Sequence, residues 1–194
     1  MTAEETIAIL KGTGALLEGH FLLTSGLHSD RYIQCALALR TPDQAGMLGA
    51  ALGARFAGVR ATLVAGPALG GIIIAHEVAR ALGVPCVFSE RVEGAMTIRR
   101  GFTITPADRV VLVEDVVTTG GSVMELARLV SAAGAEIAGY GCVVDRGSTE
   151  LKIPRRPESL ARLELPAWEP SQCPLCQKGI PAVKPGSRPG AGKR

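Results

Sequence analysis

The thirteen residues VVLVEDVVTTGGS, from Val110 to Ser122, decide the fold expected for this chain of 194 residues. Val110–Val113 is an apolar run typical of a strand that is buried on both faces. Two carboxylates, Glu114 and Asp115, follow where that strand would end, and Thr118–Ser122 then precedes a helical pattern. A strand, a short Gly/Thr/Ser loop and a helix start bring backbone N–H groups and a helix dipole together. That combination favours a bound phosphate.

The two carboxylates beside this loop limit the kinds of ligand that the loop can bind. Carboxylates repel a phosphate, so Glu114 and Asp115 should face sugar hydroxyls or a metal instead. The alternative is an ordinary strand–helix turn, in which Gly and Ser serve only as turn and cap. Neither of the better-known phosphate motifs, GxxxxGK[ST] or a GxGxxG that follows a strand, occurs in the sequence. A phosphate cradle beside two carboxylates predicts a phosphorylated sugar.

Composition indicates one α/β domain rather than two independent cores. Apolar residues make up 47% of the chain and aromatic residues only 4%, so the core should consist of Val, Leu, Ile and Ala. The net charge of +3 is small and lies partly in the C-terminal tail, which argues against a nucleic-acid surface. No apolar run approaches the ~20 residues of a membrane span, and the start lacks a basic signal region. We therefore expect a cytoplasmic protein whose five cysteines are reduced.

Hydrophobic periodicity and turn residues divide the rest of the chain into expected elements. We expect helices over about 3–11, 42–56, 72–82 and 123–133, and strands over 61–66, 84–88, 110–113 and 136–145, with two short strands around a Ser-Gly turn in 19–34. Residues 89–106 should form a charged connection. Alternation of strand and helix from 61 to 145 implies a parallel sheet with right-handed crossovers. Ligands bind at the C-terminal strand ends of such sheets, where 66–71, 114–122 and 145–146 would meet.

The pattern in 110–122 resembles the phosphoribosyl-diphosphate (PRPP) signature of the type I phosphoribosyltransferases. Other segments are similar to the orotate phosphoribosyltransferases of that family: GHFLLTSGLHSDRYIQ (19–34), VAGPALGGIIIA (64–75), VVDRG (143–147) and the stretch 99–122. The resemblance covers roughly residues 10–148. It implies a parallel Rossmann-like sheet flanked by helices, with a small N-terminal hood over the base. We expect a phosphoribosyltransferase domain over 1–165, with the hood mainly in 1–40, and a CxxC segment with a flexible basic tail over 166–194.

The resemblance also implies site residues. The residues that it assigns to PRPP are Glu114, Asp115, Val116, Val117, Thr118, Thr119, Gly120, Gly121, Ser122, Leu69, Gly70 and Arg91. Those that it assigns to orotate are Thr118, Arg146, Tyr32 and Ile33. It also implies a catalytic role for Glu114 and Asp115. An Arg fork suits the orotate carboxylate. From the residues alone, Arg146 could equally be a surface residue that follows a strand, and Tyr32 and Ile33 could simply be core residues.

The implied reaction joins orotate to PRPP, giving orotidine 5′-monophosphate and diphosphate in UMP biosynthesis. The resemblance further implies Mg²⁺ held mainly by the substrate, without a direct protein ligand, and a homodimer. One departure stands out: the loop that carries lysines and a histidine in much of the family is here SERVEGAMTIRRGF (89–102), with Arg91, Arg99 and Arg100 as its cations. Arg91 could take part of their role from the neighbouring subunit. A purine or other base as substrate, and a PRPP-sensing regulatory protein that binds nucleic acid, are the alternatives.

Cys173 and Cys176 form a CxxC pair outside these motifs. A structural zinc site needs four ligands. Cys35, Cys86 and Cys142 belong to other elements, and the three histidines show no metal-ligand spacing, so the lone CxxC is weak evidence for a zinc site, which a dimer could complete. A redox pair is disfavoured because no helix start is expected after the motif. The end of the chain, KPGSRPGAGKR (184–194), should be disordered.

Overall fold

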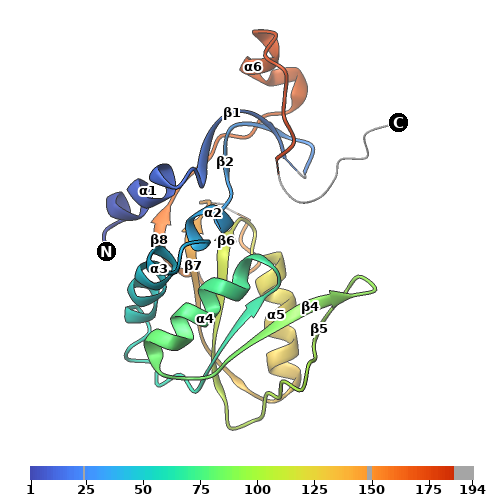
Figure 1. The fold of residues 1–194 in the computed structure, drawn as a ribbon. Helices are drawn as coiled ribbons and strands as arrows, with labels where there is room; N and C mark the ends of the chain where they lie inside the picture. Colours follow the sequence, from blue (N-terminus) through green and yellow to red (C-terminus); the bar gives the residue numbers. More distant parts are fainter. Residues whose placement is uncertain (24, 148–149, 186–194) are drawn as a thin grey trace.

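A six-stranded sheet organises the computed structural model, which describes residues 1–23, 25–147 and 150–185 (Figure 1). The strand order is β5-β4-β3-β6-β7-β8, and every neighbouring pair is parallel except β4 and β5. The strands are β3 (Leu63–Pro67), β4 (Cys86–Val92), β5 (Ala95–Ile98), β6 (Arg109–Val117), β7 (Glu136–Asp145) and β8 (Glu158–Arg162). The predicted α/β fold with a mostly parallel sheet is confirmed.

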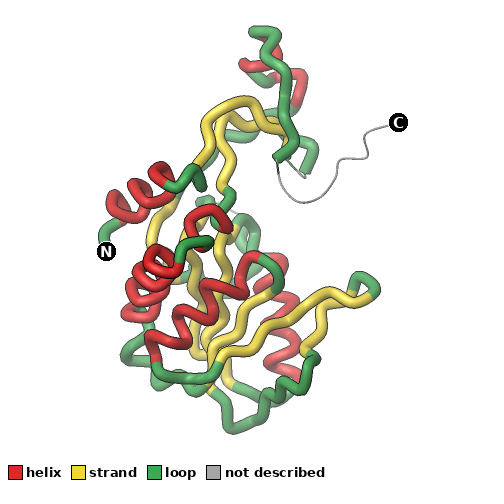
Figure 2. The backbone as a smooth tube through the Cα atoms, viewed as in Figure 1, coloured by secondary structure: helices red, strands yellow, loops and turns green. Residues whose placement is uncertain are grey.

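Helices cover both faces of this sheet (Figure 2). Val111 and Val113 of β6 lie in one hydrophobic cluster with α3 (Pro42–Ala54) and α4 (Gly70–Leu82). Leu112, between them, points to the opposite face and packs in a second cluster with α5 (Gly121–Ala132). All three side chains are fully buried. Burial on both faces explains why this strand is apolar at every position rather than at alternate ones.

The local signals at helix ends behave largely as the sequence indicates. Helix α1 (Ala3–Gly12) begins with the expected capping box between Thr2 and Glu5. Gly83 ends α4 in the left-handed conformation, with φ +70°. Helix α3 has Pro42 in its first turn, but the Thr41 hydroxyl bonds the Gln44 side chain and caps no backbone N–H group. The sequence, with Thr41 at the N-cap and Gln44 three residues later, predicts a capping box here, and that prediction is wrong.

Two strand ends and one additional strand differ from the prediction. β6 continues to Val117, so Glu114 and Asp115 lie inside the strand rather than after it. Within 89–106, β4 extends to Val92 and pairs with β5 in an antiparallel hairpin, where only a charged connection was expected. Strand β8, at the edge of the sheet, was not predicted at all. Its short, mixed sequence ESLAR carries little periodic signal.

A second, two-stranded sheet stands apart from the first, and we call it the hood because it lies in the segment where a hood is predicted. β1 (Leu16–Leu22) pairs with β2 (His28–Ile33), and α2 (Ala36–Leu39) leads back to the main body. The C-terminal segment lies beside this hairpin (Figure 1). It contains η1 (Pro170–Gln172) and α6 (Pro174–Gln177).

Backbone bonds fasten that segment to the hood. His28 and Trp168 exchange two hydrogen bonds of 2.8 Å, and Val183 bonds both His20 and Leu22. Helix α6 begins directly after Cys173, where no helix was expected. The division at residue 165 stays a prediction, and the expected disorder of 184–194 falls mostly on 186–194, outside the described residues.

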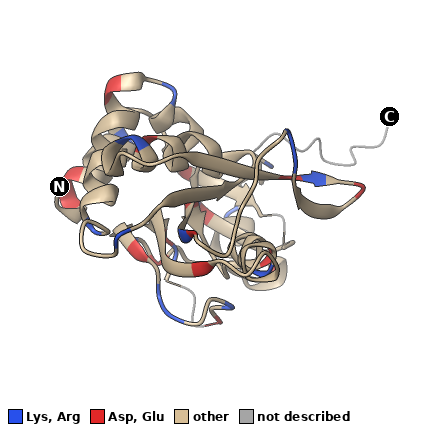
Figure 3. Cartoon of the chain, turned by 90° about the horizontal axis from the view of Figure 1, so that it is seen from below, with Lys and Arg blue, Asp and Glu red and all other residues tan. Residues whose placement is uncertain are grey.

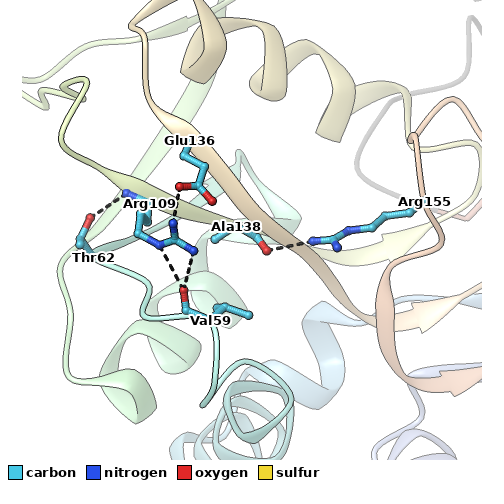
Figure 4. Close-up of polar contacts among 6 residues, drawn as sticks. All are labelled: Val59, Thr62, Arg109, Glu136, Ala138 and Arg155. Atoms are coloured by element: carbon cyan, nitrogen blue, oxygen red, sulfur yellow. Dashed lines mark hydrogen bonds and ion pairs between the residues drawn. The ribbon is translucent and has the colours of Figure 1, made fainter.

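Arg109 holds the N-terminal end of the sheet together (Figure 4). Its guanidinium donates to the Val59 carbonyl at 3.3 and 3.1 Å and forms an ion pair with Glu136. Its backbone N–H donates to the Thr62 hydroxyl at 3.0 Å. Because this end is opposite the C-terminal strand ends, these contacts serve stability and leave the other end for ligands.

Acidic and basic residues are interspersed over the ribbon seen from below (Figure 3). Among the described residues, none of the helices has both the length and the apolar character that a bilayer crossing requires.

Candidate active site

A pocket opens at the C-terminal end of β6, and its empty volume is about 450 Å³. It is lined by Glu114, Val116, Val117, Thr118, Thr119, Gly120, Gly121, Ser122 and Val123. All of these except Val123 belong to the stretch predicted to bind PRPP. The pocket lies where β6 gives way to α5, so it receives both the strand end and the helix start.

The loop before α5 is shaped to accept an anion. Gly120 has φ +77°, and its carbonyl accepts the first helical bond, from the Met124 N–H at 2.9 Å. The N–H groups of the first helical turn therefore have no acceptor within the helix and carry the positive end of its dipole. A Cβ at Gly120 would lie 2.3 Å from Ile153, so glycine is required here by space as well as by φ.

A segment that sequence reasoning missed supports this loop. The Lys152 N–H donates to the Thr119 carbonyl at 2.8 Å, and the Ile153 side chain is 4% exposed against Gly120. Residues 151–153 hold no motif, so only the close contact in space identifies their role.

The acidic pair lies against the start of α4. A Cβ at Gly70 would be 2.6 Å from both Asp115 carboxylate oxygens, and a Cβ at Gly71 would be 3.2 Å from the Glu114 Oε1 atom. Asp115 also accepts a hydrogen bond of 2.8 Å from the Val116 N–H. The two glycines thus let the helix start approach both carboxylates, whose charges its dipole favours.

Burial controls the protonation of these carboxylates. It raises the pKa of Glu114 well above its usual range, and the neighbouring Asp115 charge raises it further. Burial also raises the pKa of Asp115, although the Val116 N–H partly opposes that change. Because both pKa values are raised, the two carboxyl groups do not readily carry negative charge at the same time. A ligand that carries positive charge or donates hydrogen bonds stabilises their ionised forms.

The loop that contains the predicted PRPP residues Leu69 and Gly70, called the diphosphate loop below, borders a second pocket. Leu69 follows a cis peptide bond from Ala68, and its side chain is 80% exposed. The pocket is lined by Ala68, Leu69, Ile72, Phe88, Glu90, Arg91, Met96, Arg100 and Ser122. It therefore brings together Arg91, the diphosphate loop and the last residue of the phosphate loop, three places that the sequence assigns to PRPP.

The arginines of the β4–β5 hairpin have acidic partners within the chain. Arg91 contacts Glu125 of α5 at 2.7 Å and donates to the Gly94 carbonyl at 2.8 Å. Arg100 bonds both carboxylate oxygens of Glu90 at 2.9 Å. These side chains are exposed, so their pairs exchange readily with a strong anion.

Arg146 lies directly beyond β7 and next to the phosphate loop. Its N–H donates to the Val117 carbonyl at 2.8 Å. Its guanidinium Nε is buried and has no hydrogen-bond partner among the described residues. Burial lowers the pKa of Arg146, and nearby Tyr32 acts in the opposite direction. A buried guanidinium with an unused donor is suited to an anionic ligand.

Asp145 fixes the turn that presents Arg146; the sequence placed it at the ligand end of a strand but assigned it no role. The Asp145 side chain is fully buried, forms an ion pair of 2.5 Å with Arg156 and accepts the Gly147 N–H at 2.8 Å. The only sequence signal was a carboxylate at the end of an otherwise apolar strand. A carboxylate that is buried and fully bonded next to a site residue typically orients it.

The two residues predicted to line the base pocket, Tyr32 and Ile33, have different surroundings in the structure. Ile33 is 8% exposed and packs in the core with residues such as Leu10 and Ala15, so its side chain behaves as a core residue. Tyr32 is half-buried on β2, with its ring 5.9 Å from that of Phe21. Its role against the base stays a prediction.

The positions of two histidines also differ from what the sequence indicated about metal ligands. His20 and His28, for which no metal-ligand spacing was found, lie beside Cys173 and Cys176. One ligand atom from each of the four residues lies within 4.8 Å of the others. Sequence spacing could not reveal this group because its halves come from opposite parts of the chain.

Comparison with known proteins agrees with this geometry. Residues 54–164 match the phosphoribosyl transferase domain family. The orotate phosphoribosyltransferase of Pelotomaculum thermopropionicum is 54% identical over 188 residues, which cover 97% of this chain and 99% of that protein. That of Thermotoga maritima is 47% identical, over 93% of this chain and 96% of that protein. A crystal structure of orotate phosphoribosyltransferase from Aeropyrum pernix superposes with a TM-score of 0.69 at 27% identity, covering 81% of this chain and 93% of that one.

Proposed function

The chain belongs to the orotate phosphoribosyltransferase family, and from this premise we propose how its residues carry the transfer of a phosphoribosyl group to orotate. N1 of orotate displaces diphosphate from the anomeric carbon of PRPP, which yields orotidine 5′-monophosphate for UMP biosynthesis. One observation carries the assignment. The Arg146 N–H bonds the Val117 carbonyl at 2.8 Å, so a phosphate loop and a buried guanidinium stand at adjacent strand ends.

PRPP occupies the pocket at the end of β6. Its 5′-phosphate accepts hydrogen bonds from Thr118–Ser122, where backbone N–H groups and hydroxyls converge. Glu114 and Asp115 accept hydrogen bonds from the ribose 2′- and 3′-hydroxyls. As the bond to diphosphate lengthens, positive charge grows on the sugar, and the same carboxylates stabilise it. Catalysis therefore consists mainly of positioning and electrostatics.

Orotate is held at the neighbouring strand end. The Arg146 fork binds its carboxylate, and the unused Nε donor supplies one of the two parallel hydrogen bonds. Tyr32 stacks on the ring from the hood, and the Thr118 hydroxyl bonds the base. Ile33, the other residue that the resemblance assigns to orotate, follows Tyr32 on β2 and is buried in the core.

Mg²⁺ fits this set of donors. Carboxylate oxygens are the ligands that it prefers, and it retains several waters, so Glu114 and Asp115 would hold it through water, with the substrate supplying most of its ligands. When bound, the ion would supply positive charge against the leaving diphosphate.

Leu69, Gly70 and Arg91 complete the diphosphate end. The peptide groups of 69–70 approach the leaving group. In a homodimer, Arg91 of one subunit gives up its contact with Glu125 and binds a diphosphate oxygen in the site of its partner. The five cysteines are free thiols, which suits a protein of the cytoplasm.

The assay is the loss of orotate absorbance by purified protein with PRPP and Mg²⁺, with adenine, hypoxanthine, xanthine and uracil in parallel reactions. Orotate consumption that requires both PRPP and Mg²⁺ is expected. Consumption of another base in place of orotate would transfer the assignment to a purine or other pyrimidine. PRPP binding without turnover of any base, together with nucleic-acid affinity that falls steeply with salt, would favour the regulatory alternative.

A further inference from the structure

Four potential metal ligands meet between the hood and the C-terminal segment. His20 lies on β1 and His28 begins β2, while Cys173 is the N-cap of α6 and Cys176 lies within that helix. The His20 Nε2 atom lies 2.8 Å from the His28 Nδ1 atom and 3.4 Å from the Cys173 sulfur. The Cys176 sulfur lies 3.2 Å from His28 Nδ1 and 3.8 Å from His20 Nε2. No function described above uses these side chains.

These distances are close to the edges of a tetrahedral zinc site. Zn–N bonds of about 2.05 Å and Zn–S bonds of about 2.3 Å give N···N edges of about 3.3 Å and N···S edges of about 3.5 Å. The observed N···S separations of 3.2, 3.4 and 3.8 Å surround that value, and the N···N separation of 2.8 Å requires only a small opening. All four ligand atoms lie within 4.8 Å of one another, so a single ion among them would be within reach of each.

The protonation of His20 is already set for metal binding. Its Nδ1 atom lies 2.7 Å from the Ile180 carbonyl oxygen, which can only accept, so Nδ1 carries the proton. The lone pair of Nε2 therefore points at the two cysteines and His28. A backbone carbonyl that orients a histidine in this way is a regular partner of metal-binding imidazoles. Ile180 is itself held by a hydrogen bond of 3.1 Å to the Leu175 carbonyl.

Burial and charge also fit a divalent ion. Cys173 is fully buried, and His20 and His28 are 4% and 9% exposed, whereas Cys176 lies closer to the surface. Two thiolates and two neutral imidazoles balance the charge of Zn²⁺, so the assembled site is neutral, as burial demands. Thiolate and imidazole together select zinc over the Mg²⁺ of the active site.

We propose that His20, His28, Cys173 and Cys176 bind a structural Zn²⁺ that fastens the C-terminal segment to the hood. All four positions are filled by the protein, which leaves no coordination site for a substrate. The hood needs such support because an isolated two-stranded hairpin is only marginally stable. Since β2 also carries Tyr32, the ion indirectly holds one side of the base site.

Metal analysis of the purified, untreated protein tests this directly. A single Zn²⁺ per chain is expected in the wild type and in the control Cys86→Ser, whose thiol lies on β4 away from the cluster. The double variant Cys173→Ser/Cys176→Ser should contain none. Zinc retained by the double variant, or a Cys173–Cys176 disulfide without metal in the mass spectrum of the wild type, would overturn the proposal.

Cobalt keeps the test informative if the double variant fails to fold. Wild-type protein stripped with a chelator and titrated with Co²⁺ should develop the intense visible absorption of a tetrahedral site, with thiolate-to-cobalt bands, and reach saturation at one equivalent. The Cys86→Ser control should behave identically. Weak octahedral absorption, or none, would exclude the assigned ligand set.

Hydrogen exchange then locates the effect of the ion. Removal of zinc should accelerate exchange about tenfold or more at the amides of Leu22, His28, Trp168 and Val183, which join the hood to the C-terminal segment. The Val111 amide, in the central sheet, serves as the internal control. Unchanged exchange at the four amides would show that the ion, even if bound, does not fasten the hood.

Discussion

Gly70 and Asp115 are in such close contact that no side chain fits between them: a Cβ at position 70 would lie 2.6 Å from both carboxylate oxygens. Glycine at this position lets the start of α4 approach the acidic pair. The helix dipole, rather than a side-chain cation, faces these carboxylates.

We expect Gly70→Ala to displace the Asp115 carboxylate and to lower kcat/KM for PRPP by about tenfold or more, because the loss of one charge-assisted hydrogen bond corresponds to that factor. The measurement is steady-state kinetics with varied PRPP. Gly58→Ala is the control, since a Cβ there has nothing within 4 Å. Equal activity of the two variants would show that the contact can relax.

Asp115→Asn should lower turnover while the fold is preserved. The amide keeps the size of the side chain but cannot balance the cationic sugar of the transition state. Turnover numbers, with circular dichroism to verify folding, test this expectation. Wild-type turnover would remove Asp115 from the proposed sugar-binding role.

Glu114→Gln should make the free protein more stable at pH 8. Burial and the Asp115 charge raise the pKa of Glu114 in the folded state above its unfolded value. The folded state therefore binds the proton more tightly, and stability falls as pH rises from the unfolded pKa through the folded one. The amide removes this loss, so we expect a rise in Tm of about 2–4 °C at pH 8.

The same gain in Tm should vanish near pH 4, where the carboxyl group of the wild type is protonated. Melting curves at both pH values make the comparison. A gain that is equal at the two pH values would mean that packing, and not ionisation, is responsible.

Arg146→Ala should raise the orotate KM by about 10- to 100-fold, the range of a buried charge-assisted hydrogen bond, with a much smaller effect on the PRPP KM. Arg146→Lys retains the charge but loses the fork, so it should recover only part of the affinity. Equal increases in both KM values would argue against a carboxylate clamp.

Subunit mixing tests the role of Arg91 across a dimer. Arg91→Ala and Asp115→Asn should each be weakly active alone, and mixed dimers should regain activity because one of their two sites receives an intact Arg91 and an intact Asp115. The readout is activity after the two variants are unfolded and refolded together. No recovery would place Arg91 in the site of its own subunit or outside the reaction.

Sequence reasoning succeeded where one segment contains its own evidence. The strand, acidic pair and phosphate loop of 110–122 are contiguous, so the pocket they form could be predicted almost residue by residue. The reasoning failed where partners come from distant segments. Asp145 with Arg156, Ile153 against Gly120, and the histidines beside Cys173 are brought together only by the fold. Edge strand β8 was not predicted for a different reason. A short strand that mixes polar and apolar residues has no clear hydrophobic period.

The pairing of the hood with the C-terminal segment also has a consequence for the order of events during protein synthesis. His20 and Ile180 are in contact although they are 160 positions apart. At about 5–20 residues per second, the ribosome needs on the order of 10 s to add the chain between them. During that interval the sheet from β3 to β7 can assemble, while the β1–β2 hairpin still lacks Trp168 and Val183. The phosphate end of the site can therefore form first on the ribosome, whereas the part predicted to cover the base acquires its last partners only after Trp168 and Val183 have been added.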